Sequence, residues 1–362
     1  MPRLLLVALG QLTGAVLEHL ARRGSFDQIV VASRSPAKAR AKINNARIGA
    51  ALDGKYPNIT AIELDFNRPN AARVLRATRP DVAFAAPSLL PWWALDRLAP
   101  TAKARIAGLP FAAFMACHLA PMLRLRDAWM ESGLQCPWIG ASYPDVVNHI
   151  LALTGAAPTC GIGNLAEAVP KVRFVAAAGL GVAESELNIK LVAQHAFEYF
   201  VYGDGKATDR PPFMLEVRHG DRDVTDMVRA SLFSAFPIPY DADFNRITAG
   251  AAGSVIEALA GENDVADHVP APNGLLGGYP VTISRRGVRL DLPGQWTPAE
   301  AEAINRASLP WDGIADVERD GTVVFTDKTA QGLHGILGRS VERLRPADAD
   351  TMADALITAL RP

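Results

Sequence analysis

The first 87 residues alternate short apolar runs with stretches of helical spacing. Between the first two runs, Val16, Leu17 and Leu20 recur on one side of a helical pattern that stops at Gly24. Continuous apolar runs bounded by turns are typical of strands buried on both faces of a parallel sheet. The pattern therefore predicts strands that alternate with helices in an open α/β sheet. The predicted strands span residues 3–9, 28–35, 59–64 and 81–87.

A glycine-containing turn, residues 10–14, joins the first predicted strand to the first predicted helix. Strand, turn, helix and strand in one short unit form the dinucleotide-binding layout, in which N–H groups at the helix N-terminus face a pyrophosphate. The glycine motif of that layout is incomplete, because its three positions hold Ala8, Gly10 and Thr13. The alternative is a tight turn in another kind of α/β domain. We expect cofactor contacts from Gly10, Gln11, Leu12, Thr13 and Gly14.

The end of the second predicted strand bears on which cofactor is bound. It reads Ser33-Arg34-Ser35, whereas NAD-binding units carry an Asp or Glu there for the ribose 2′-hydroxyl. An arginine beside hydroxyl groups suits a 2′-phosphate by charge and by hydrogen bonding. Ser33 and Arg34 therefore favour NADP, with NAD possible, although an ordinary surface arginine is the alternative. Ala86 and Pro87 follow the fourth strand and are expected beside the nicotinamide.

The second half of the chain has a mixed pattern. A Pro-Asp turn at residues 144–145 leads into an apolar helix, and a short strand is predicted to end at residues 163–164. Glu167 lies at the start of the next helix, and a further strand leads to His195. A lone histidine after an apolar strand is also compatible with a purely structural role.

Residues beyond 249 add further helices and strands. A helix, a two-strand hairpin that turns at Gly287 and a helix with Thr297 as its N-cap follow one another. A strand and two helices, near residues 328–338 and 347–360, complete the chain. The whole pattern predicts a Rossmann-type α/β parallel sheet with a C-terminal α+β substrate domain. The predicted boundaries are 1–143 for the nucleotide-binding domain and 144–362 for the substrate domain.

Composition restricts the class of protein further. The 362 residues are 49% hydrophobic and 21% charged, which allows two packed domains, and the net charge is −1. That charge leaves no excess of basic residues of the kind that binds nucleic acid or a membrane surface. Three widely spaced cysteines argue against a disulfide framework or a cysteine metal site, and no apolar run is long enough to span a bilayer. We expect a cytoplasmic protein that acts on a small molecule.

Three segments carry a resemblance to a known superfamily. They read A-S-Y-P-D-V-V-N from residue 141, G-I-G-N-L-A-E from residue 161 and L-V-A-Q-H-A from residue 191. Together they resemble the catalytic half of the lactate/malate dehydrogenases, and the likeness returns over residues 249–314. The resemblance implies an NAD(P)-dependent oxidoreductase that moves a hydride to or from a small carbonyl, hydroxyl, imine or amine compound. It also implies a homodimer or homotetramer.

The resemblance assigns roles to individual residues. In the superfamily a histidine exchanges a proton with the substrate, a carboxylate orients that histidine and an arginine binds the substrate carboxylate. These positions fall on His195, Glu167 and Pro170, so the acid/base pair is retained and the arginine is missing. We expect Glu167 and His195 to be hydrogen-bonded neighbours. Ser142 is assigned to the cofactor, and the substrate is assigned to Tyr143, Asn245, Arg105 and Arg246, the last as a replacement for the missing arginine.

Three other interpretations remain open from the sequence. The missing arginine also fits a non-catalytic nucleotide sensor or an inactive partner subunit. A family-4-type glycosidase shares the implied fold and uses NAD, but it needs a cysteine where this chain has Gly163. The N-terminal half is also similar to saccharopine-dehydrogenase-like reductases, which carry Ser-Arg after the second strand. Those reductases lack the three segments that resemble the dehydrogenases.

Overall fold

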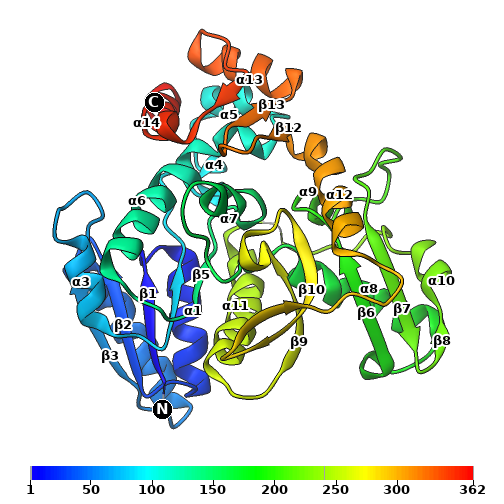
Figure 1. The fold of residues 1–362 in the computed structure, drawn as a ribbon, viewed down its shortest axis with the longest axis horizontal. Coiled ribbons are helices and arrows are strands. Elements are labelled where there is room, and N and C mark those ends of the chain that lie inside the picture. The colour runs from blue at the N-terminus through cyan, green and yellow to red at the C-terminus, as the bar shows by residue number, and fades with distance from the viewer. Residues whose placement is uncertain (1, 240, 362) are drawn as a thin grey trace.

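The N-terminal half of the computed structural model is a five-stranded parallel sheet. The structure describes residues 2–239 and 241–361. The strand order is β3-β2-β1-β4-β5 (Figure 1). This order confirms the predicted Rossmann-type sheet. Its strands are β1 (Arg3–Val7), β2 (Gln28–Ser33), β3 (Asn58–Glu63), β4 (Val82–Ala85) and β5 (Trp138–Gly140).

Alternate side chains of the sheet enter two separate cores. Leu5 and Val7 of β1 belong to one buried cluster, whereas Leu4 and Leu6 belong to the other. Successive side chains point to opposite faces of a strand, so a strand covered on both faces is apolar at every position. The helices of this half are α1 (Gln11–Arg23), α2 (Pro36–Leu52), α3 (Ala71–Thr78), α4 (Trp92–Leu95), α5 (Pro100–Ile106), the 3-10 turn η1 (Phe111–Phe114) and α6 (Ala116–Ser132).

The second half contains two antiparallel sheets surrounded by helices. One joins β6 (Leu187–Val192), β7 (Met214–His219) and β8 (Arg222–Asp223), and the other joins β9 (Val265–Pro270), β10 (Gly278–Ser284) and β11 (Gly287–Leu290). The helices and 3-10 turns are α7 (Pro144–Leu153), α8 (Leu165–Leu180), η2 (Glu184–Glu186), α9 (Ala196–Val201), α10 (Thr225–Arg229), η3 (Ala242–Phe244), α11 (Asn245–Ala260), η4 (Pro272–Gly274) and α12 (Pro298–Ala307). This mixture confirms the predicted α+β character.

Two local predictions in this half have different outcomes. The Thr297 hydroxyl accepts the Glu300 N–H at 3.2 Å, and the Glu300 carboxylate accepts the Thr297 N–H at 2.8 Å, which is the expected helix cap. The strand predicted to end at residues 163–164 is wrong. That segment makes a single bridge, between Cys160 and Ile139 of β5, because the chain turns away into α8.

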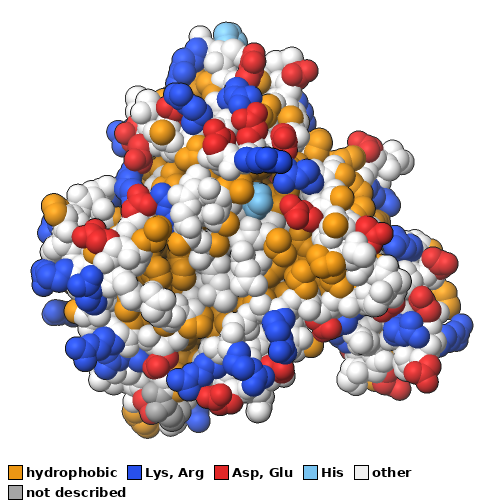
Figure 2. All heavy atoms as spheres, in the orientation of Figure 1, with side chains coloured by type: hydrophobic (Ala, Val, Ile, Leu, Met, Phe, Trp, Pro, Cys, Tyr) orange, Lys and Arg blue, Asp and Glu red, His pale blue; other side chains and the backbone are white. Residues whose placement is uncertain are grey.

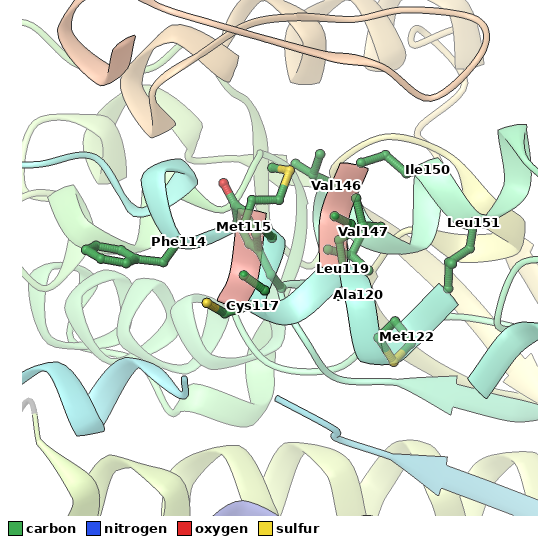
Figure 3. Packing of buried hydrophobic residues seen from close by; sticks show 14 of the residues in the cluster. Phe114, Met115, Cys117, Leu119, Ala120, Met122, Val146, Val147, Ile150 and Leu151 are labelled. Atoms are coloured by element: carbon green, nitrogen blue, oxygen red, sulfur yellow. The ribbon is translucent and has the colours of Figure 1, made fainter. Parts of the chain in front are cut away.

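Residues 309–360 pack on the first half rather than extending the second. They form η5 (Leu309–Asp312), β12 (Ile314–Val317), β13 (Val323–Phe325), α13 (Asp327–Leu337), β14 (Arg343–Leu344), η6 (Pro346–Asp348) and α14 (Ala349–Leu360). Helix α14 lies against α6 (Figure 1). Below it, α6 packs on α7 through side chains that include Leu119, Met122, Val147 and Ile150 (Figure 3). This core holds η5 next to the start of α7.

The face shown in Figure 2 carries no large patch of charge of one sign. Lys and Arg side chains are interspersed with Asp and Glu, and apolar side chains gather toward the middle of the face (Figure 2). Within the described residues, no helix combines the length and the apolar character needed to cross a membrane.

Candidate active site

Two cavities meet at the carboxyl ends of the parallel strands. The central cavity, about 400 Å³, lies between the sheet and the second half and includes Gly10, Asn164 and His195 in its lining. The edge cavity, about 620 Å³, lies over the ends of β1 to β3 and includes Ser33 and Arg34. Both linings contain Gly10, Ala86 and Ser88. The carboxyl edge of an open parallel sheet is where such folds bind ligands.

The turn between β1 and α1 forms the wall between the two cavities. Ala8 stands at φ 64°, in the left-handed region that favours glycine. The Thr13 hydroxyl donates to the Ala8 carbonyl at 2.9 Å, and the Gly10 N–H donates to the same oxygen at 2.7 Å. These two hydrogen bonds stabilise, at Ala8, a backbone conformation that the first glycine of the motif would adopt more easily. No described side chain caps the N-terminus of α1, which leaves its first N–H groups to face a ligand.

The structure separates the five predicted turn residues. Gly10, Gln11, Leu12 and Thr13 line the central cavity. Gly14 is not part of either described lining. An added Cβ at Gly14 would stand 3.2 Å from the Lys42 amine, so this glycine allows α1 and α2 to approach.

The edge cavity is rich in cations. Ser33 ends β2, Arg34 follows, and the Ser35 hydroxyl accepts the Lys38 N–H at the start of α2. Burial lowers the pKa of Lys42, whose amine donates to the Gly10 carbonyl. Asp65 is the one carboxylate in the described lining. The basic side chains in that lining are Arg34, Lys38, Lys42 and Arg124.

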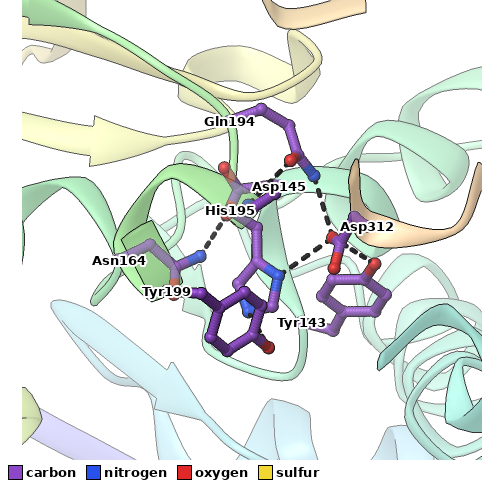
Figure 4. Close-up of polar contacts among 8 residues, drawn as sticks. Tyr143, Asp145, Asn164, Gln194, His195, Tyr199 and Asp312 are labelled. Carbon is purple, nitrogen blue, oxygen red and sulfur yellow. Dashed lines mark hydrogen bonds and ion pairs between the residues drawn. The ribbon is translucent and has the colours of Figure 1, made fainter. Parts of the chain in front are cut away.

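His195 lies at the far end of the central cavity, just after β6. Its Nδ1 lies 2.9 Å from Oδ2 of Asp312 (Figure 4). A carboxylate only accepts hydrogen bonds, so Nδ1 carries the proton and the lone pair of Nε2 is directed away from Asp312. The hydroxyl of Tyr199 lies 3.4 Å from Nε2. The Tyr143 ring stands edge-on to the imidazole, with centroids 4.9 Å apart.

Asp312 is held in its charged form although it is fully buried. Burial raises the pKa of its carboxyl, but the charge of His195 and hydrogen bonds from His195, Tyr143 and Gln194 outweigh burial, and the net shift is downward. The Gln194 amide donates to Oδ2 at 3.0 Å. Burial lowers the pKa of His195, but the attraction of Asp312 reverses that effect and raises it overall. The pair is therefore arranged to stabilise a protonated imidazole.

The expected hydrogen bond between Glu167 and His195 is wrong. Glu167 caps α8, where its Oε2 accepts the Asn164 N–H at 3.0 Å. The described bonds of the imidazole go to Asp312 and Tyr199 instead. Glu167 still lines the central cavity with His195. Sequence order missed Asp312 because it lies 117 residues after His195, in a short turn that carries no recognisable motif.

The predicted substrate residues divide between the cavity and other places. Tyr143 and Asn245 line the central cavity. The Arg246 side chain is 82% exposed and pairs with Asp243, so the proposed replacement for the missing arginine does not reach the cavity. Arg105 instead donates to the carbonyls of Ile336 and Ala359, where it ties α5 to the C-terminal helices. Neither arginine is part of the described linings.

The remaining predicted residues lie where the two cavities join. Ala86 lines both cavities, and Pro87 lines the edge cavity. The Ser142 hydroxyl donates to the Pro87 carbonyl at 2.6 Å, which ties β5 to the loop after β4. The segment after that loop contributes Trp92, Trp93 and Phe111 to the central cavity wall.

Comparison with known proteins identifies the fold. No family model matches the sequence, and no curated protein does. Solved structures do match: a lactate dehydrogenase from a Medee basin deep-sea metagenome library has a TM-score of 0.58 at 11% identity, covering 86% of this chain and 96% of that chain. The chain has the fold of the lactate and malate dehydrogenases.

Two further structures support the same likeness. The malate dehydrogenase of Aeropyrum pernix has a TM-score of 0.56 at 13% identity and covers 85% of this chain and 95% of its own. The Cryptosporidium parvum lactate dehydrogenase, solved with lactic acid and nicotinamide adenine dinucleotide, has a TM-score of 0.52 at 16% identity and covers 86% and 98%. At these identities the likeness concerns the fold, and the chemistry must be argued from the residues of this chain.

Proposed function

We propose that the protein is an NADP-preferring oxidoreductase in which His195 and Asp312 form the acid/base pair. The observation that carries the proposal is that His195, paired with the buried Asp312, lines a cavity that adjoins the β1–α1 turn. This combination is what a hydride-transfer enzyme needs, because a proton must leave or reach the substrate as the hydride moves.

A dinucleotide fits the residues along the two joined cavities. The N-terminus of α1 and the turn at Gly10 suit a pyrophosphate, since an Ala8 in glycine geometry leaves the backbone N–H groups accessible. Ser33 and Arg34 would hold an adenosine 2′-phosphate. Ala86 would lie beside the nicotinamide, because it lines both cavities. When bound, this cofactor supplies or accepts the hydride.

His195 exchanges a proton with the substrate in this proposal. With Nδ1–H committed to Asp312, Nε2 accepts a proton from a substrate hydroxyl or returns it to a carbonyl or imine. Asp312 stabilises the imidazolium that results, and Tyr143 and Gln194 keep the carboxylate oriented. A cavity of about 400 Å³ suits a small substrate together with the reactive end of the cofactor.

Calorimetric titration of NADP and NAD tests the cofactor assignment. We expect NADP to bind more tightly, and Arg34→Ala to weaken NADP by roughly 1.5–3 kcal/mol, the contribution of a charged hydrogen bond. Arg40→Ala on the exposed side of α2 is the matched control and is expected to leave both affinities unchanged. Equal affinities in wild type would contradict the NADP preference. Binding without turnover on any substrate would instead favour the nucleotide sensor.

A further inference from the structure

The central cavity has an unusual charge pattern. Among the described residues that line it, Asp96, Glu167 and Glu198 are acidic and none is Lys or Arg. Two histidines also belong to the described lining: burial lowers the pKa of His118 to about 3 and keeps it neutral, and the imidazole of His195 is already paired with Asp312. The edge cavity has the opposite pattern, with four basic side chains. A substrate with a carboxylate would therefore meet no counter-charge in the central cavity.

Glu167 and Glu198 form a buried carboxyl pair on the cavity wall. They come from the first turn of α8 and from α9 and are 3% and 4% exposed. Oε2 of Glu167 caps the helix, whereas Oε1 of each residue has no hydrogen-bond donor from a described group. The two carboxyls are close enough for the charge of Glu167 to raise the pKa of Glu198.

The pair therefore carries at most one negative charge. Burial raises the pKa of Glu167 to about 7, and burial together with Glu167 raises the pKa of Glu198 well above its usual range. Two adjacent carboxyls in a site of low dielectric do not both ionise. The remaining charge is costly to bury without a partner, and a cation from a ligand would compensate it.

The rest of the wall suits a cation with an apolar body. Trp92 and Trp93 stand edge to face with their centroids 5.8 Å apart, and the Phe244 ring lies 6.4 Å from Trp92. All three line the central cavity. Aromatic faces attract ammonium groups and also pack against hydrocarbon.

We propose that the substrate carries a protonated amine, which the Glu167–Glu198 pair binds while the reacting carbinol or carbonyl faces His195. This inference rests on the proposed function for one point, namely that the carbinol or carbonyl of the substrate faces His195. The amine preference itself follows from the cavity alone. The proposal replaces the 2-hydroxy-acid substrate that the fold would suggest, because the anion-binding arginine of that substrate class has no equivalent in the described lining.

Three probes with one carbon skeleton test the charge preference in the whole protein. They are 2-amino-1-phenylethanol, 1-phenyl-1,2-ethanediol and mandelate, which present a cation, a neutral hydroxyl and an anion beside the same carbinol. Calorimetric titration, with and without NADP, should rank the amine first by at least about tenfold, the usual gain from a charged hydrogen bond. Mandelate or the diol binding as tightly as the amine would overturn the proposal.

Variants separate the charge of the pair from its shape. Each single variant, Glu167→Gln or Glu198→Gln, removes one carboxyl and should weaken amine binding, but by less than the double variant. The double variant Glu167→Gln, Glu198→Gln removes the charge and should lose at least about tenfold. Glu131→Gln with Glu302→Gln, both on other faces, is the matched control. Unchanged amine affinity in a folded double variant would overturn the proposal.

The titrations also distinguish a failure of this inference from a failure of the proposed function. If NADP fails to bind while the amine still ranks first in the cofactor-free protein, the proposed function fails and the cavity preference holds. If NADP binds and mandelate ranks first, the amine preference alone is overturned. The ranking in wild type uses no variant, so it stands even where a buried substitution prevents folding.

Discussion

The edge cavity and the central cavity lie side by side but differ in charge and in origin. Basic side chains line the edge cavity, and three of the four, Arg34, Lys38 and Lys42, lie within ten residues of sequence, whereas Arg124 comes from α6. The central cavity is acidic and is assembled from segments as distant as Gly10, His195 and Asn245. The two cavities therefore suit different ligand groups. The cationic edge cavity suits a phosphate, and the acidic, aromatic central cavity suits a different kind of group.

The largest expected effect comes from the central cavity. His195→Asn should lower turnover by roughly 10²–10⁴, the usual contribution of a positioned acid/base group, and leave NADP affinity unchanged. The proposed cofactor contacts lie in the edge cavity and the β1–α1 turn, away from His195, so the substitution should affect turnover without affecting cofactor affinity. Because Asp312 raises the pKa of His195, turnover in the oxidising direction should rise with pH through a value above the usual range of histidine.

The control for this prediction is His334→Asn, at an exposed position on α13. It should retain both the pH dependence and the rate. Full activity of His195→Asn on the true substrate would show that this histidine is structural, and it would leave the central cavity without an acid/base group.

Asp312→Asn tests how the pair contributes to folding. Breaking a buried ion pair leaves a charge without its partner, so we expect a loss of roughly 3–5 kcal/mol at pH values where His195 is protonated. The pKa of Asp312 is lowered in the fold, so its stabilisation is lost as pH falls through that folded pKa. The pKa of His195 is raised, so its stabilisation is lost as pH rises through its folded pKa.

Urea unfolding across pH measures this contribution. The difference between wild type and Asp312→Asn should be largest between the ordinary pKa values of Asp and His, about 3.9 and 6.5. It should shrink as pH falls through the folded pKa of Asp312 and as pH rises through the folded pKa of His195. The difference also includes the effect of Asp312 on Asp145, whose pKa the charge of Asp312 raises. A difference that does not vary with pH would mean that Asp312 acts through packing and not through charge.

The smallest effect is expected at the wall between the cavities. Ala8→Gly should raise the free energy of unfolding by roughly 0.5 kcal/mol, because relief of the left-handed conformation exceeds the added backbone entropy. Ala15→Gly within α1 should lower it by roughly 0.5–1 kcal/mol. A destabilised Ala8→Gly would show that the Thr13 bond to the Ala8 carbonyl already removes the strain.

Local pattern was enough to predict the parallel sheet, the β1–α1 turn and the positions of Ser33 and Arg34. Each depends on residues close together in sequence, where strand burial and turn geometry leave a visible signature. The resemblance also placed Tyr143, Asn245 and His195, which all line the central cavity. The homo-oligomeric state and the cytoplasmic setting stay predictions.

The carboxylate partner could not be predicted in the same way. Glu167 has the expected place in the sequence, but its side chain turns back to cap α8. Asp312 reaches His195 only because the C-terminal segment packs on α6 and brings η5 to the start of α7. The Arg246 prediction failed for a different reason. Asn245 begins α11 and lines the cavity, but the sequence does not specify which way the next side chain on that helix points.

The decisive measurement is a structure of the protein with NADP bound, because it shows whether one molecule occupies both cavities. We predict the 2′-phosphate within hydrogen-bonding distance of Arg34 and Ser33, the pyrophosphate against the Gly10 turn, and the nicotinamide on the same side of the central cavity as Nε2 of His195. A cofactor bound elsewhere, or one whose nicotinamide lies away from His195, would contradict the account.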